Sequence, residues 1–129
     1  MAKIVVIDDD PNNLLLYREI LEEEGHQTLT VADSRQAHAI IRKESPDIIL
    51  CDIIMPKLSG VELCELVKCD EGTKNIPIIL MSGIFDHDDA RKKMKQAGYQ
   101  PDDYLVKPFD NETLLIRIKN LLKERGQQT

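Results

Sequence analysis

Short apolar runs alternate with amphipathic stretches along the whole chain, and this alternation is the strongest architectural signal in the sequence. Several runs are nearly uniform in Ile, Val and Leu, which is typical of strands buried on both faces of a parallel sheet. They predict five strands, at residues 3–7, 27–31, 47–51, 76–81 and 103–106. Between them, apolar residues recur every three or four positions. This spacing predicts five helices, at about residues 12–24, 34–44, 59–69, 87–97 and 111–124.

The residues at the element boundaries support the same division. Ser59 and Glu62 have the spacing of a capping box, in which each side chain satisfies an orphan backbone donor. Gly25 and Gly98 stand where helices should end, and Asp110 stands where the last helix should begin. The sequence therefore predicts an α/β fold, a flavodoxin-like (βα)5 doubly wound parallel sheet with strand order 2-1-3-4-5.

The size and composition fit a single globular unit. With 129 residues, 42% of them hydrophobic and 31% charged, the chain can form one core. We expect the domain to span residues 1–125 and residues 126–129 to form a tail or a truncated linker. The formal net charge of −6 disfavours direct binding to nucleic acid. No stretch of about 18 apolar residues predicts a membrane span, and we expect a cytoplasmic protein.

Polar residues follow four of the predicted strands. In open α/β sheets, ligands bind beyond the carboxyl ends of the strands, where the strand order reverses. The residues at those ends are Asp8-Asp9-Asp10, Asp52, Ser82-Gly83 and Lys107-Pro108. Carboxylates gathered at one edge repel one another unless a hard divalent cation neutralises them, and Mg²⁺ is the natural candidate. With a lysine and a hydroxyl nearby, these groups suit phosphoryl transfer to a carboxylate.

Four motifs in this order make the sequence similar to a known family. They are Ile7-Asp8-Asp9-Asp10-Pro11, the segment from Cys51 to Pro56 with Ser59-Gly60 after it, Ser82-Gly83, and the segment from Asp103 to Phe109. Each motif alone is weak, but the combination at the ends of four strands is specific. The chain resembles the receiver domain of two-component response regulators over nearly its whole length.

This resemblance implies a phosphoacceptor and a metal site. Asp52 would be the nucleophile that takes a phosphoryl group from a phosphohistidine. Asp9, Asp52 and the backbone carbonyl of Ile54 would bind Mg²⁺ directly, and Asp8 would act mainly through bound water. The chain would not be an enzyme beyond catalysing its own phosphorylation and dephosphorylation.

The resemblance also implies a switch. Lys107 would pair with the phosphoryl oxygens, and Ser82 would hydrogen-bond one of them once the group is attached. Tyr104 matches the switch aromatic of the family, whose ring moves inward when the Ser82 hydroxyl is drawn to the phosphate. This movement would alter the surface formed by the fourth helix, the fifth strand and the fifth helix.

The implied partners follow from these roles. A sensor histidine kinase or a histidine phosphotransfer protein would supply the phosphoryl group. The output would pass to a downstream protein or to a fused output domain, and the switched surface could form a homodimer. The sequence does not decide between a stand-alone receiver and a piece of a longer regulator.

Two other functions compete with this interpretation. Asp8-Asp9-Asp10 also supplies the Asp-x-Asp of a Mg²⁺-dependent haloacid dehalogenase phosphatase, with Asp8 as the nucleophile and Asp10 as the acid/base. That family's second acidic pair should follow the lysine, whereas Asp102-Asp103 precedes Lys107. The third possibility is an interaction module that keeps the fold but is not phosphorylated.

Ile54 and Ile84 lead to a first testable prediction. They lie two residues beyond Asp52 and Ser82, where the family often has polar side chains that influence hydrolysis. Because an isoleucine cannot orient an attacking water, we expect a long-lived Asp52 phosphate. Ile54→Asn combined with Ile84→Glu should speed its loss, measured as release of inorganic phosphate from the phosphorylated chain. An unchanged rate would contradict this expectation.

Overall fold

The computed structural model describes residues 1–124, and for residues 84–87 it describes the backbone but not the side chains. Strands and helices alternate along the chain, as predicted. The strands are β1 (Lys3–Ile7), β2 (Gln27–Val31), β3 (Ile48–Asp52), β4 (Ile78–Gly83) and β5 (Asp103–Lys107). The helices are α1 (Pro11–Glu23), α2 (Ala37–Glu44) after a 3-10 turn (Ser34–Gln36), α3 (Gly60–Cys69), α4 (Ile84–Ala97) and α5 (Asn111–Glu124).

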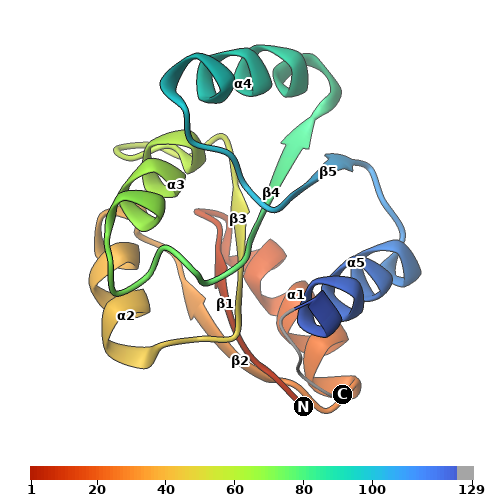
Figure 1. Cartoon of the computed structure of the whole chain (residues 1–129). Helices are drawn as coiled ribbons and strands as arrows, with labels where there is room; N and C mark the ends of the chain where they lie inside the picture. The colour runs from red at the N-terminus through yellow and green to blue at the C-terminus, as the bar shows by residue number, and fades with distance from the viewer. Residues whose placement is uncertain (125–129) are drawn as a thin grey trace.

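The five strands form one parallel sheet in the order β2-β1-β3-β4-β5, which confirms the predicted topology (Figure 1). β1 and β3 are neighbours at the centre, and Ile7 pairs with Cys51 at their carboxyl ends. The residues that follow this pair, Asp8 and Asp52, therefore leave the sheet side by side. The strand order alone therefore brings Asp8 and Asp52 together.

The sheet has a hydrophobic core on each face. One core joins the strands to α2, α3 and α4, and the other joins them to α1 and α5, so the helices form two outer layers (Figure 1). Alternate residues of a strand point to opposite faces, which explains why Val5 lies in the first core and Val6 in the second. Among residues 1–124, no helix has the length and apolar character that a membrane span requires.

The boundary signals read from the sequence are confirmed. Ser59 and Glu62 form both hydrogen bonds of the capping box at the start of α3. Gly25 and Gly98 have φ values of 89° and 83°, in the left-handed region that glycine adopts without steric cost. Asp110 accepts a hydrogen bond from the Thr113 backbone at 2.7 Å and so caps α5.

Some boundaries differ from the prediction. Helix α4 begins at Ile84, three residues before the start predicted at about residue 87. Its N-cap is Gly83, which has no side chain to form a capping hydrogen bond, and the sequence therefore gave no start signal there. Strands β3, β4 and β5 also run on to include Asp52, Ser82 and Lys107. The expected tail, residues 126–129, lies outside the described residues.

Gly60 is required by the close approach of α3 to the end of β3. Its backbone amide donates to the Ile53 carbonyl oxygen at 2.8 Å. A Cβ atom at this position would lie 2.4 Å from the Asp52 carbonyl oxygen and 2.7 Å from the Ile53 Cα. No side chain fits there, so a glycine seats the first turn of α3 directly against the Asp52 backbone.

Gly60→Ala should therefore destabilise the domain by about 1–3 kcal/mol, because the added methyl group overpacks against backbone atoms that cannot move aside. The change is measured as a shift in the urea midpoint of unfolding. Gly72→Ala is the matched control, since its Cβ would lie 3.5 Å from the nearest atom, an ordinary contact distance. Equal midpoints for the two variants would contradict this account.

Candidate functional site

Three carboxylates converge at the carboxyl edge of the sheet. Asp8 and Asp9 follow β1, Asp52 ends β3, and one oxygen of each lies within 4.8 Å of the others. Asp8 is 1% exposed and Asp52 9%, whereas Asp9 is open to solvent. Three anions at this separation repel one another strongly where burial keeps water away. Carboxylate oxygens are the ligands that Mg²⁺ prefers, so the donor set fits this ion.

The buried carboxylate of Asp8 is held by two donors. The backbone amide of Asp10 donates to Oδ1 at 3.0 Å, and Asn13 Nδ2 donates to Oδ2 at 3.1 Å. Burial raises the pKa of Asp8, and the nearby charge of Asp52 raises it further, while these hydrogen bonds oppose the shift. Sequence reasoning missed Asn13, although its place in the first turn of α1, which follows the aspartates, could have indicated it.

Lys107 supplies the positive charge of the site. It ends β5, and its Nζ donates to Asp52 Oδ2 at 3.0 Å. Burial alone would lower the pKa of Lys107, but the hydrogen bond and charge of Asp52 outweigh it, so that this pKa is raised. The other Asp52 oxygen, Oδ1, accepts from the Ile54 backbone amide at 3.3 Å. Asp52 is therefore fixed through both oxygens.

Ser82 lies in β4 between Met81 and Gly83, which pair with residues of the two neighbouring strands. Met81 pairs with Asp52 of β3, and Gly83 pairs with Lys107 of β5. Ser82 is fully buried. The strand register thus places this hydroxyl residue between the phosphoacceptor candidate and the lysine at the same edge of the sheet.

Tyr104 is the second residue of β5 and contacts α4. Its hydroxyl group contacts Met94 Sδ at 3.5 Å, and the Arg91 guanidinium lies 5.6 Å from its ring centroid. The ring packs against the core shared with α2, α3 and α4, and burial raises the pKa of the phenol. The predicted switch residue therefore touches a helix of the predicted switch surface.

Other acidic residues near these motifs are engaged elsewhere. Asp10 caps α1 by accepting from the Asn12 backbone amide at 2.9 Å. Asp102 pairs with Lys68 at 2.8 Å, and Asp103 pairs with Arg117 at 2.7 Å. None of these three carboxylates belongs to the cluster formed by Asp8, Asp9 and Asp52. This arrangement removes the groups that a haloacid dehalogenase phosphatase would use as its acid/base and second acidic pair.

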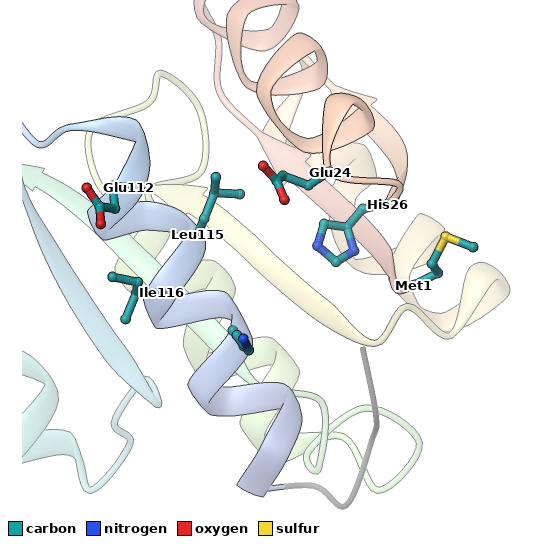
Figure 2. A pocket seen from close by; sticks show the side chains of 7 residues that line it. Met1, Glu24, His26, Glu112, Leu115 and Ile116 are labelled. Carbon is teal, nitrogen blue, oxygen red and sulfur yellow. The ribbon is translucent and has the colours of Figure 1, made fainter.

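One hollow on the described residues lies away from this edge. It has a volume of about 430 Å³ and lies between the start of the chain, the end of α1 and the outer side of α5. Figure 2 shows Glu24 and His26 across from Leu115 of α5. His26 Nδ1 accepts a hydrogen bond from the Ala2 backbone amide at 3.1 Å. None of the predicted site residues lines this hollow.

The comparison with known families decides the assignment. The family model described as "Response regulator receiver domain" matches residues 4–119, which include every predicted site residue. The chain belongs to the response regulator receiver family. Receiver domains serve phosphorylation-based two-component signalling, and they bind Mg²⁺ at an acidic pocket such as the one formed here by Asp8, Asp9 and Asp52.

Similar proteins agree with this receiver assignment. Protein PilH of Pseudomonas aeruginosa is 36% identical, over 95% of this chain and 98% of PilH. The phosphate regulon transcriptional regulatory protein PhoB of the same species is 35% identical over 95% of this chain, which spans only 52% of PhoB. The solved receiver domain from Clostridium thermocellum is 32% identical, with a TM-score of 0.86 over 98% of both chains.

The pair formed by Lys107 and Asp52 predicts an energetic coupling. In magnesium-free buffer, Lys107→Met should destabilise the receiver by about 1–3 kcal/mol, because a nearly buried carboxylate loses its charged donor. In a variant that also carries Asp52→Asn, the same lysine change should cost less. Urea unfolding of the two single variants and the double variant measures this coupling. Strictly additive effects would contradict it.

Proposed function

We propose that Asp52 accepts a phosphoryl group from a sensor histidine kinase or a histidine phosphotransfer protein. The observation that carries the proposal is the placement of the Asp52 carboxylate, which is held by Lys107 at 3.0 Å and lies within 4.8 Å of oxygens of Asp8 and Asp9. An oxygen of Asp52 attacks phosphorus while the bond from phosphorus to the imidazole nitrogen breaks. The imidazole leaves with the electron pair of that bond.

The residues that would hold Mg²⁺ are Asp9, Asp52 and the carbonyl of Ile54, with Asp8 acting mainly through water. Asp8 already accepts two hydrogen bonds, which supports the indirect role, and the exposed Asp9 is open to a hydrated ion. The Ile54 backbone amide donates to Asp52 Oδ1 at 3.3 Å, so the backbone of Ile54 runs beside the carboxylate. When bound, Mg²⁺ would neutralise charge on the carboxylates and the phosphoryl oxygens.

Lys107 and Ser82 would complete the reaction site. Lys107 would move its hydrogen bond from the carboxylate to a phosphoryl oxygen, so that its charge follows the anion. The Ser82 hydroxyl group would donate to another phosphoryl oxygen. Ser82 is fully buried, and its neighbours Met81 and Gly83 pair with Asp52 and Lys107, which supports a role at this edge of the sheet.

The output would be a change in the populations of two conformations. Tyr104 would respond to Ser82, and the surface of α4, β5 and α5 would change with it. The contact of Tyr104 with Arg91 and Met94 supports this route, since both residues belong to α4. A downstream protein, a fused output domain or a second receiver would bind this surface.

We assign the receiver to residues 1–125, an extent supported by the family match over residues 4–119. The receiver is a signalling domain whose chemistry is limited to its own phosphorylation and dephosphorylation. The cytoplasmic location stays a prediction from the sequence.

Asp52→Asn should abolish phosphoryl incorporation from acetyl phosphate, because the amide is a far poorer nucleophile than the carboxylate. Intact-mass spectrometry with peptide mapping measures the modification, and removing Mg²⁺ with a chelator should suppress it in the unaltered chain. Asp10→Asn is the control, since asparagine also caps helices and Asp10 lies outside the cluster. Labelling that persists in Asp52→Asn, or maps to Asp8, would overturn the assignment.

A further inference from the structure

Helix α4 carries an unusual concentration of positive charge for this chain. Four of the 17 Lys and Arg residues stand within residues 91–95, although the formal net charge of the chain is −6. The acidic residues Asp88 and Asp89 lie nearer the start of the helix. The helix dipole favours this order along the axis. The helix dipole does not explain why several of these cations lie close together on the helix surface.

Three of these cations surround one hollow. Arg91, Lys92 and Lys95 are exposed and, at spacings of one, three and four residues, lie on neighbouring rows of the helix surface. With Asp88 and Gln100 they line a hollow of about 310 Å³. Among the residues that the structure describes, none of the three cations has an acidic partner within 4.0 Å, whereas Lys93 pairs with Asp89 at 3.5 Å. The hollow is therefore lined by three cations and one carboxylate, and its charge is positive on balance.

Arg91 also connects this hollow to the predicted switch. Its guanidinium lies over the ring of Tyr104, 5.6 Å from the centroid, a distance at which a cation is attracted to the face of an aromatic ring. Arg91 also lines the hollow with Lys92 and Lys95. If the Tyr104 ring moves away, Arg91 loses this contact, and its donors become available to another acceptor.

We propose that the hollow lined by Arg91, Lys92 and Lys95 binds a carboxylate-rich segment of the downstream protein, and that Tyr104 controls the contribution of Arg91. The dependence of this binding on phosphorylation rests on the proposed function, because phosphorylation at Asp52 is what would move the Tyr104 ring. Guanidinium and carboxylate match in a bidentate hydrogen-bonded pair, while the two lysines supply point charges beside it. The exposed positions of all three cations suit a partner that approaches from solvent.

The charges favour a protein partner over nucleic acid. Three cations neutralise only a few phosphates, and the chain as a whole, with its net charge of −6, would repel an extended phosphate backbone. Asp88 lines the same hollow and would repel a continuous run of phosphates, whereas a short acidic segment can place its carboxylates on the cations alone.

The probe for the binding site is a fluorescein-labelled glutamate-rich peptide, titrated against the full chain at low ionic strength and followed by fluorescence anisotropy. Lys92→Glu combined with Lys95→Glu should weaken binding about tenfold or more, because two attractions become repulsions. Lys43→Glu combined with Lys123→Glu is the matched control, with the same change in net charge at exposed positions of α2 and α5. An equal loss in both double variants would overturn the proposed site.

The role of Tyr104 is tested without phosphorylation. Tyr104→Leu removes the aromatic face that holds Arg91 and should tighten peptide binding roughly fivefold, while Tyr104→Phe keeps the ring face and should leave the affinity unchanged. Adding Arg91→Gln to Tyr104→Leu should abolish the gain. Unchanged affinity in Tyr104→Leu, with its fold verified by circular dichroism, would overturn the control by Tyr104.

Phosphorylation forms the last arm, and its extent is measured by intact mass. A chain that carries the phosphoryl group should bind the peptide more tightly than the unmodified chain, and Arg91→Gln should remove that difference. Equal affinity of the two forms would overturn the proposal that phosphorylation controls peptide binding. A chain that takes up no phosphoryl group would instead contradict the proposed function, and the Tyr104 variants would then test the control by Tyr104. Tighter binding of a fluorescein-labelled single-stranded oligonucleotide than of the peptide would overturn the choice of partner.

Discussion

Electrostatic repulsion among carboxylates at one edge of the sheet is the constraint on which the rest of the structure depends. Asp8 and Asp52 are both nearly inaccessible to water, so their charges are poorly screened. Lys107 compensates them only because β5 ends at the same edge, with β4 between it and Asp52. The strand order is therefore part of the chemistry of the site, since it brings together charges that are far apart in the sequence.

The two hydrophobic cores give this edge its rigidity. Residues on opposite faces of the same strands pack against different helices, so that the ends of β1 and β3 are held from both sides. Gly60 adds a third support, because α3 begins in direct contact with the Asp52 backbone. An acidic group positioned in this way needs little reorganisation when a phosphoryl donor arrives, which is the main contribution that a protein makes to this kind of transfer.

Much of this arrangement could be predicted from the sequence, because the carboxyl ends of parallel strands meet at one edge. That rule predicts that Asp8, Asp9, Asp52 and Lys107 lie together, as they do, and turn and cap residues such as Gly25 and Asp110 mark the helix ends. The predicted roles of these residues in phosphoryl transfer and metal binding are a different matter, since they concern states with ligands bound.

The features that could not be predicted from the sequence depend on contacts between distant residues or lack a capping residue that would mark them. Helix α4 starts without a side-chain cap, so the sequence predicts its start only at about residue 87. Asp102 and Asp103 gave no sign of their partners, Lys68 and Arg117, because those ion pairs form only once α3, β5 and α5 are packed. The stacking of Tyr17 on Phe109, with ring centroids 6.5 Å apart, likewise depends on the packing of α1 beside the end of β5.

The unequal anchoring of the two helices beside β5 has a mechanical consequence. Among the described side chains, α5 buries Leu114, Ile118, Leu121 and Leu122 in its core, whereas α4 buries Ala90 and Met94. Tyr104 packs on the α4 side, and the next residue, Leu105, packs on the α5 side. Judged by the described side chains alone, sliding α4 along the sheet would therefore disturb fewer apolar contacts than sliding α5, which makes the α5 flank the stiffer one in this part of the chain.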